Sequence, residues 1–271
     1  NYAGAIIGGR YPVVEGEVTG LPIPAASEIV LEGWLEEGKT TAEGPYGEWH
    51  GYYSGGEYPA FRVEVEAVLH RNDPILLGSP PGKPPHDYSY FRSVMKSALI
   101  FDSLVKAGVP AVQGVWCDEA GGGRLWINVS IKQQFLGHAR MAGFVASQCH
   151  AGAYMGRYVV VVDEDIDIHD YGALDWAFAY RVNAAEDDIV FFPSTFGSLL
   201  DPSTRLSERD PMLYGTGKWC RVLIDATRNL DYEPDPSFDG ARFPPTVHPS
   251  EEDSAAVDAR AEELGFKKIE K

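Results

Sequence analysis

A proline-rich segment near residue 80 separates two different sequence patterns. The segment GSPPGKPPHD, residues 78–87, contains four prolines and two glycines. Proline removes a hydrogen-bond donor from the backbone and restricts the conformation of the residue before it, so regular strands and helices do not continue through such a segment. We therefore expect domains at residues 1–80 and 81–230, followed by an arm at residues 231–271.

Residues before this boundary show short β-rich runs broken by glycine and proline. In FRVEVEAVL the apolar residues Phe61, Val63, Val65 and Ala67 alternate with polar or charged residues. This alternation predicts an antiparallel strand with one half-buried face. We expect the first domain to be a sheet or a barrel.

Residues after the boundary alternate between helical and strand patterns. Apolar residues at helical spacing predict a helix over residues 90–108, ending at a glycine, and a second long helix over about 134–155. Strands are predicted at AVQGVW, residues 111–116, and RLWINVSI, residues 124–131. The continuous apolar run YVVVV, residues 158–162, predicts a strand covered on both faces.

The acidic run DEDIDIHD, residues 163–170, follows that last strand. A calcium or magnesium site is one interpretation, but the run lacks the glycine and the final glutamate of an EF-hand loop. The favoured interpretation is a strand-end loop in which Asp170 caps a helix over residues 170–182. A strand at DIVFF, residues 188–192, then completes the β-α-β order of an α/β domain.

The end of the chain is rich in proline and acidic residues from residue 231 and has little with which to build a core. We expect an extended arm there. From about residue 250 the composition predicts a terminal helix, docked on its own or on a neighbouring subunit.

The charge and composition exclude several classes of function. The 271 residues include 40 acidic and 23 basic side chains, a net charge of -17 that disfavours binding to nucleic acid. No apolar run reaches membrane-spanning length, so we expect no membrane span and a cytoplasmic location. The three cysteines and seven histidines show no metal-ligand spacing, so we expect no metal site within this chain.

The segment TAEGPYGEWHGYYSGG, residues 41–56, is the strongest candidate for chemistry. Residues five apart share no face on a regular helix or strand, so Glu43 and Glu48 need an irregular backbone to converge. Gly44, Pro45 and Gly47 supply it. Two nearby carboxyl groups packed against aromatic residues can differ in pKa, so that one acts as an acid and the other as a base. The simpler interpretation is that both are solvated turn residues.

Several sequence motifs of this chain resemble those of the UbiD family of prenylated-flavin decarboxylases. The resemblance is carried by PAASEIVLEG at 24–33, EGPYGEWHGY at 43–52 and RNDPI at 71–75. Later segments, SIKQQFLGHARMA, VVVVDEDIDIHDYGALDWAFAYR and RVLIDATR, are similar to the family's carboxy-terminal half. The resemblance extends from about Tyr2 to Arg228.

The resemblance implies a fold and an activity. The fold is α+β and α/β: part of a split β-barrel flavin-binding domain, then an α/β domain and a terminal helical arm. The implied activity is the reversible, non-oxidative decarboxylation of an aromatic, heteroaromatic or α,β-unsaturated carboxylic acid. Glu48 would be the proton donor and Glu43 the partner of an upstream arginine.

The resemblance also implies cofactors and partners. Prenylated FMN, Mn²⁺ and K⁺ are the family's cofactors, and the metal ligands and the arginine align before Asn1. Three explanations stay open: this sequence is a fragment of a longer chain, it is one half of a cleaved chain, or it works with a separate subunit. The favoured one is an amino-terminal half present as a separate or cleaved chain, in a homo-oligomer. The alternative function is a non-catalytic flavin-binding or assembly subunit, which the absent upstream ligands favour and the intact acidic motif disfavours.

Substrate selection is expected from two positions in the carboxy-terminal half. The resemblance places Arg92, near a helix start, and Leu199, in a loop, beside the flavin. An arginine at that position could hold a second carboxylate or a phenolate of the substrate. The other interpretation of Arg92 is a side chain that reaches from a helix into water.

Overall fold

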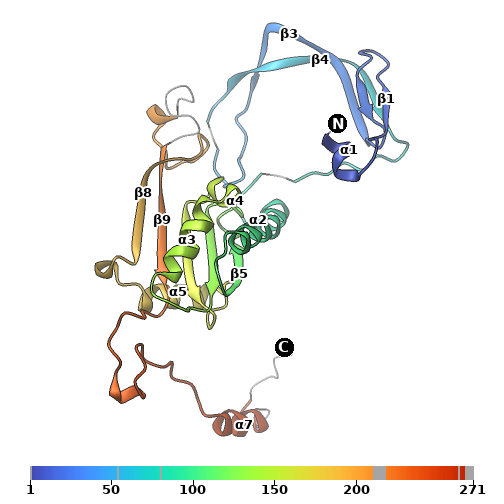
Figure 1. The fold of residues 1–271 in the computed structure, drawn as a ribbon. Coiled ribbons are helices and arrows are strands. Elements are labelled where there is room, and N and C mark those ends of the chain that lie inside the picture. Colours follow the sequence, from blue (N-terminus) through green and yellow to red (C-terminus); the bar gives the residue numbers. More distant parts are fainter. Residues whose placement is uncertain (1, 54, 80, 210–217, 262, 266–271) are drawn as a thin grey trace.

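A five-stranded mixed sheet forms the centre of the larger body of the molecule (Figure 1). The computed structural model describes residues 2–53, 55–79, 81–209, 218–261 and 263–265. The strand order is β5-β6-β7-β9-β8, in which β6, β7 and β9 are parallel and the two edge strands are antiparallel to their neighbours. The strands are β5 (Val112–Cys117), β6 (Trp126–Ile131), β7 (Tyr158–Asp163), β8 (Ile189–Phe196) and β9 (Lys218–Ala226).

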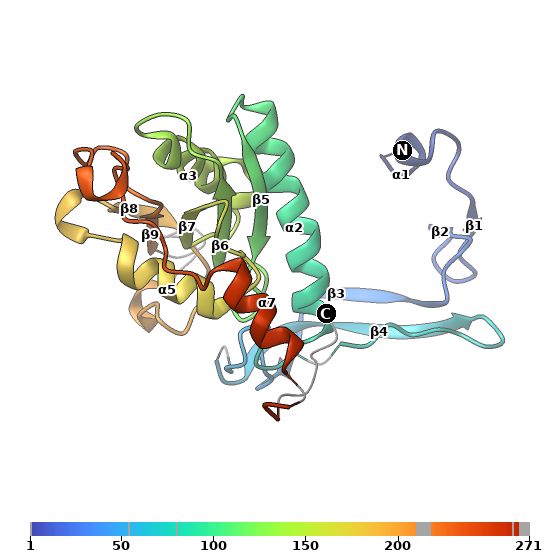
Figure 2. The same cartoon turned by 90° about the horizontal axis from the view of Figure 1, so that it is seen from below.

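Helices cover both faces of this sheet, which lies between α3 and α5 in Figure 2. One face is covered by α2 (Asp87–Lys106), α3 (His138–Gln148) and the short α4 (His150–Ala153), and the other by α5 (Tyr171–Arg181). The expected strand YVVVV is confirmed as β7, and its residues 159–162 are fully buried between the two helical layers. The predicted α/β order of this half is therefore confirmed.

The second predicted helix differs from the expectation, because it is divided in two. Cys149 has an extended backbone, φ -61° and ψ 156°, which ends α3 at Gln148. Its thiol accepts a hydrogen bond from the backbone N–H of Gly152, 3.4 Å away, and so caps α4. A side chain at Gly152 would collide with the carbonyl oxygen of Ala146, so the bend also depends on this glycine.

A long two-stranded ribbon extends from this body, as Figures 1 and 2 both show. It consists of β3 (Ile29–Glu43) and β4 (Tyr58–His70), paired antiparallel with a bulge at Glu32/Gly33. A Cβ atom at Gly33 would lie 2.1 Å from the carbonyl oxygen of Glu64, so only glycine fits the bulge. The far end of the ribbon lies beside β1 (Val13–Glu15) and β2 (Pro22–Pro24), where Val14, Ile23, Val30 and Leu69 line one pocket; α1 (Tyr2–Ile7) precedes β1 in the chain.

The apolar face of β4 is open, which corrects the expectation that it is half-buried. The pairing is antiparallel as predicted, but Phe61 is 70% exposed and Val63 and Val65 are also exposed. A ribbon of two strands has no second layer of its own to cover this face. In the described residues the first half contains two two-stranded sheets, β1-β2 and β3-β4.

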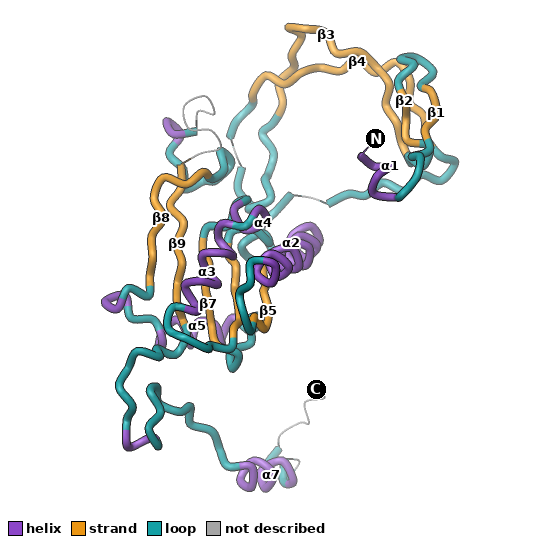
Figure 3. The backbone as a smooth tube through the Cα atoms, viewed as in Figure 1, coloured by secondary structure: helices purple, strands orange, loops and turns teal. Residues whose placement is uncertain are grey.

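The chain leaves the sheet after β9 and continues mainly as loop (Figure 3). The predicted terminal helix is confirmed as α7 (Glu251–Ala259), which is capped by the side chain of Ser250 and buries none of its residues. Short 3₁₀ turns occur at η1 (Ala184–Glu186), η2 (Leu206–Glu208) and η3 (Pro236–Phe238). Among the described residues, no helix combines the length and the apolar character needed to cross a membrane.

Candidate functional site

Glu48 lies in a closed turn at the near end of the ribbon. Its backbone N–H donates to the carbonyl oxygen of Tyr52 at 2.9 Å, and its own carbonyl accepts from the N–H of Gly51 at 2.8 Å. Gly47 and Tyr53 pair across the turn as an isolated antiparallel bridge. The turn therefore fixes the backbone of Glu48 from both sides.

Trp49 anchors this turn to the α/β body. Its side chain is 8% exposed and packs in a cluster with Met155 and Trp219. This cluster lies at the amino-terminal ends of the parallel strands. Gly122 has φ +69°, and a Cβ atom there would lie 2.7 Å from two ring carbons of Trp49. The glycine run in the β5–β6 loop thus makes the space in which the Trp49 ring sits.

Arg124 also contacts the Trp49 ring. The centre of its guanidinium is 4.5 Å from the ring centroid, a cation–π contact. Arg124 donates to the sulfur of Met155 at 3.1 Å and to the hydroxyl of Tyr88 at 3.4 Å. Its Nε is buried without a hydrogen-bond partner.

The charge of Glu48 reaches Arg124. Burial lowers the pKa of the Arg124 guanidinium, and the neighbouring Tyr154 and Glu48 oppose that shift. The predicted proton donor is therefore close enough to the α/β body to interact with a buried cation.

Glu43 has different neighbours from Glu48. It is the last residue of β3, directly opposite Tyr58 of β4. The hydroxyls of Tyr46 and Tyr58 are 2.5 Å apart, and this hydrogen bond, with burial and the nearby Glu43 carboxylate, raises the pKa of Tyr58. The two acids therefore flank one glycine-proline turn, with Glu43 toward a pair of tyrosines and Glu48 toward Arg124.

The other two segments of the resemblance meet at the far end of the ribbon. Glu28 is 3.3 Å from the Nε of Arg71, and its carboxylate also accepts from the backbone N–H of Ile75 at 3.2 Å. Because β3 and β4 run antiparallel, this contact lies at the opposite end from Glu43 and Glu48. These residues close the ribbon rather than approach the two acids.

Arg92 lines a pocket between α2 and α4. The pocket has a volume of about 250 Å³ and is lined by Arg92, Met95, Lys96, Leu99, Arg124, His150, Ala151 and Tyr154. Burial and the adjacent Arg124 lower the pKa of Arg92 to about 10. Leu199, by contrast, lies outside this pocket, although the following residue, Leu200, packs against the Trp49 cluster.

Sequence reasoning missed two cations of this pocket, Lys96 and Arg124. The Nζ of Lys96 donates to the carbonyl oxygens of Arg124 and Tyr154, each at 2.9 Å, and burial lowers its pKa to about 8. A signal was present, because Lys96 follows Ser89 and Ser93 on the face of α2 that packs inward. For Arg124, a place at the start of the predicted strand 124–131 gave no comparable signal.

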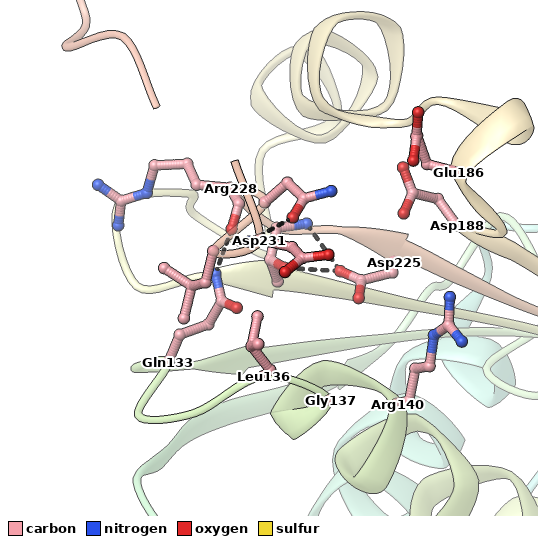
Figure 4. Close-up of a pocket in the computed structure, with 12 residues that line it drawn as sticks. Gln133, Leu136, Gly137, Arg140, Glu186, Asp188, Asp225, Arg228 and Asp231 are labelled. Atoms are coloured by element: carbon pink, nitrogen blue, oxygen red, sulfur yellow. Dashed lines mark hydrogen bonds between the residues drawn. The ribbon is translucent and has the colours of Figure 1, made fainter. Parts of the chain in front are cut away.

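A second pocket lies at the opposite end of the parallel strands (Figure 4). It has a volume of about 280 Å³ and its charged residues have both signs. In the close-up Gln133 donates to the carbonyl of Arg228. The hydroxyl of Thr227 donates to the carboxylate of Asp225. Arg140 projects from α3 toward the loop that carries Asp188.

The acidic run beside this second pocket has a structural role, as the favoured interpretation predicted. Asp170 caps α5 by accepting from Gly172 and Ala173. Asp163 and Asp165 both pair with the buried Arg181. Within the part of the chain that the structure describes, no group of three or more His, Cys, Asp or Glu side chains is arranged to hold a metal ion.

Comparison with known families agrees with this fold and with the motif around Glu48. Residues 89–226 match the model of the 3-octaprenyl-4-hydroxybenzoate carboxy-lyase C-terminal domain, UbiD_C. Residues 1–84 match the Rift-related domain of the same carboxy-lyase, UbiD. The chain belongs to the UbiD family.

Curated relatives are about twice as long as this chain. An uncharacterized protein of Aeropyrum pernix is 32% identical over 267 residues, which are 98% of this chain and 51% of the relative. A phenolic acid decarboxylase of Escherichia coli O157:H7 is 32% identical over 225 residues, which are 83% of this chain and 44% of that enzyme. The chain thus spans about half the length of the curated relatives it matches.

Solved structures of related enzymes also match this chain over about half of their own length. The UbiD-class enzyme HmfF from Pelotomaculum thermopropionicum, in complex with FMN, is 30% identical with a TM-score of 0.68, covering 94% of this chain and 52% of that one. The closed form of Sedimentibacter hydroxybenzoicus vanillic acid decarboxylase is 28% identical with a TM-score of 0.69, covering 93% and 49%. The predicted mixed α/β architecture is therefore that of UbiD-class structures.

Proposed function

We propose that this chain forms part of a decarboxylase that acts reversibly, without oxidation, on an aromatic, heteroaromatic or α,β-unsaturated carboxylic acid. The observation that carries the proposal is the Glu48 turn, closed by backbone hydrogen bonds and anchored on the α/β body by Trp49. A group that moves a proton needs such a fixed position. Membership of the UbiD family supports the class of reaction.

The proposed chemistry needs an electron sink and an acid. When the bond between the ring or vinyl carbon and the carboxylate breaks, CO₂ leaves and the electron pair stays on that carbon. Prenylated FMN, when bound, would supply the sink. Glu48 in its acid form then delivers the proton of its carboxyl oxygen to the carbon, and it recovers a proton from water.

Glu43 is proposed to pair with an arginine from the family's amino-terminal half. Its place at the end of β3, beside Tyr46 and Tyr58, leaves it at the edge of the ribbon. The described residues gather no set of metal-ligating side chains, so they do not by themselves fit Mn²⁺. We propose that Mn²⁺, K⁺ and most of the contacts to prenylated FMN come from that other half.

The open face of the ribbon supports the proposal of an amino-terminal partner. The exposed side chains of Phe61, Val63 and Val65 on β4 form an apolar stripe of the kind that a further strand or sheet covers in a folded protein. Strands of the amino-terminal half, as a separate or cleaved chain, would complete the split barrel here. The complete protein is proposed to be a homo-oligomer.

Native mass spectrometry of the purified protein, protected from light, tests this partnership. We expect a second polypeptide and a small-molecule mass that matches prenylated FMN. A folded, monodisperse species that contains this 271-residue chain alone would contradict the partner proposal.

The substitution Glu48→Gln tests the proton donor. The amide keeps the size of the side chain but cannot deliver a proton, so we expect CO₂ release and solvent-deuterium exchange to fall by roughly 100-fold or more while flavin stays bound. Glu57→Gln, at an exposed acid between the turn and β4, is the matched control and should change neither rate. Undiminished exchange by Glu48→Gln would remove Glu48 from the reaction.

The same assay separates the alternative function. A non-catalytic flavin-binding or assembly subunit would bind the cofactor and its companion chain. It would release no CO₂ from any of the three substrate classes in either the wild-type protein or the variants.

A further inference from the structure

Lys96 is a buried lysine whose amino group is held by the backbone. Its side chain is 7% exposed and lies on the inward face of α2. Its Nζ donates to the carbonyl oxygens of Arg124 and Tyr154, each at 2.9 Å. Two such hydrogen bonds suit an uncharged amine as well as an ammonium, because a neutral amino group has two N–H donors and one lone pair. The lone pair takes the remaining direction at the nitrogen, and Lys96 lines the pocket between α2 and α4.

The surroundings of Lys96 favour the uncharged amine. Burial lowers its pKa to about 8, and the charges of Arg124 and Arg221 lower it further. Cys117 and Cys149 oppose the shift. At pH 8 about half of the Lys96 side chains are therefore neutral, a fraction about 100-fold larger than for an exposed lysine. A neutral amine in a desolvated site beside other cations is a nucleophile.

The pocket surrounds this amine with positive charge. Arg92 and Arg124 line it together with Lys96, and its lining contains neither aspartate nor glutamate. Glu48, whose charge reaches Arg124, lies outside the lining. Arg92 lies 4.2 Å from the ring centroid of Tyr88, and burial and the charge of Arg124 lower its pKa. A negative charge formed at Lys96 would therefore lie in a pocket that two guanidinium groups line.

The rest of the lining suits a small uncharged reactant. Met95, Leu99 and Ala151 are apolar, and His150 and Tyr154 complete the wall. The pocket has a volume of about 250 Å³, ample for a molecule of three atoms. CO₂ fits this description, because it carries no charge, its carbon is electrophilic and its adduct with an amine is an anion. It is also released by the proposed reaction.

We propose that Lys96 is a carbamate site, at which the amine binds CO₂ covalently. The lone pair of the neutral Nζ forms a bond to the carbon of CO₂, and one C=O electron pair moves onto oxygen. The nitrogen then loses one proton to water, which leaves the carbamate anion –NH–CO₂⁻. Its remaining N–H keeps one of the two carbonyl contacts, and its oxygens accept from the guanidinium groups of the pocket.

The adduct changes the charge of the pocket. Conversion of an ammonium into a carbamate takes Lys96 from +1 to -1, so the combined charge of Arg92, Lys96 and Arg124 falls from +3 to +1. Repulsion among the cations is thereby replaced by attraction to an anion. Dissolved CO₂ is sufficient to form the adduct, so the site is independent of the proposed function, and turnover would only raise the local concentration of CO₂.

Carbon-13 bicarbonate tests the proposal with the complete, flavin-loaded protein and without substrate. At pH 8 we expect a protein-bound carbamate resonance, separate from those of bicarbonate and dissolved CO₂. Alkylation with a trialkyloxonium salt converts the carbamate into a stable ester, which peptide mapping should place on Lys96. The labelled fraction at exposed lysines should be lower by about tenfold or more.

The pH dependence supplies a second readout. At a constant concentration of dissolved CO₂, lowering the pH from 8 to 6.5 removes the neutral amine, so the carbamate signal of Lys96 should fall by about tenfold or more. Lys96→Met should abolish the signal. Lys106→Met is the matched control, because it changes an exposed lysine of the same helix and should keep the signal. Thermal unfolding shows that each variant is folded, and the mapping in wild-type protein needs no variant.

Absence of a carbamate from the wild-type protein at pH 8 would overturn the proposal. A label on a different lysine, or an undiminished signal from Lys96→Met, would overturn it equally. CO₂ release from substrate is measured separately, so these outcomes leave the proposed decarboxylation untouched. A protein that forms the carbamate but releases no CO₂ from any acid would disprove only the proposed function.

Discussion

The guanidinium of Arg124 lies 4.5 Å from the ring centroid of Trp49, the residue that follows Glu48. A desolvated cation–π contact of this kind is worth about 2 kcal/mol. It joins the start of β6 in the α/β body to the turn at the end of the ribbon. The position of the proposed proton donor therefore depends on side chains about 75 residues away from it in sequence.

Trp49→Ala should destabilise the protein and loosen the turn. Removing this buried ring leaves a cavity beside Met155 and Trp219, so we expect the free energy of unfolding to fall by about 3–5 kcal/mol. Trp34→Ala, at a half-exposed position in β3, should cost much less. Urea denaturation measures both, and equal losses would show that Trp49 is not an anchor.

Gly122→Ala should be more harmful than the same change at Gly108. Both glycines have a positive φ, +69° and +78°, so both alanines carry backbone strain of about 1 kcal/mol. Only at Gly122 would the added Cβ also collide with the Trp49 ring. We expect a larger fall in melting temperature and a change in tryptophan fluorescence for Gly122→Ala alone; indistinguishable variants would contradict the packing described above.

Lys96 should make stability rise with pH above pH 8. Burial lowers its pKa from 10.5 to about 8, with smaller effects from Cys117 and Arg124. Between these two values the unfolded chain binds more protons than the folded one, so the free energy of unfolding increases with pH. The full effect is on the order of 3 kcal/mol.

Lys96→Met should flatten that part of the profile, whereas Lys106→Met, at an exposed lysine of the same helix, should keep it. Urea midpoints between pH 7 and pH 10.5 provide the comparison. A rise that persists unchanged in Lys96→Met would assign it to another group.

Asp163→Asn should destabilise the α/β body. The buried carboxylate of Asp163 accepts from Arg181, from both the backbone and the side chain of Arg228, and from Gln133. Loss of its charge leaves buried cationic groups partly unpaired, at a cost of about 3 kcal/mol. Asp167→Asn, at an exposed acid of the same run, should be nearly neutral by thermal unfolding; a comparable loss there would argue against the ion-pair explanation.

Much of the α/β half could be predicted from sequence because its signals are local. The run YVVVV can be buried only between two layers, and Asp170 precedes an apolar helical pattern as an N-cap does. The break between α3 and α4 was not predictable, because it depends on an extended backbone at Cys149 and on close contact at Gly152. The open face of β4 was missed because alternation indicates a face to be covered but not what covers it.

Only part of the candidate site could be predicted from the sequence. Glycine and proline around Glu43 and Glu48 indicated an irregular turn. Arg92 lines a pocket between α2 and α4, but whether that pocket faces the flavin is untested. Lys96 and Arg124 acquire their significance from burial in one pocket, which emerges only when α2, α4 and the β5–β6 loop pack together. The site roles of Glu43, Glu48, Arg92 and Leu199 stay predictions.

The most direct measurement is decarboxylation in deuterated water by the purified protein loaded with prenylated FMN. Aromatic, heteroaromatic and α,β-unsaturated acids would be supplied in turn, with CO₂ followed by mass spectrometry and the product by nuclear magnetic resonance. We expect CO₂ release from at least one class, with one deuterium at the carbon that carried the carboxylate. Neither CO₂ release nor deuterium exchange from any class, by protein shown to hold the flavin, would contradict the account.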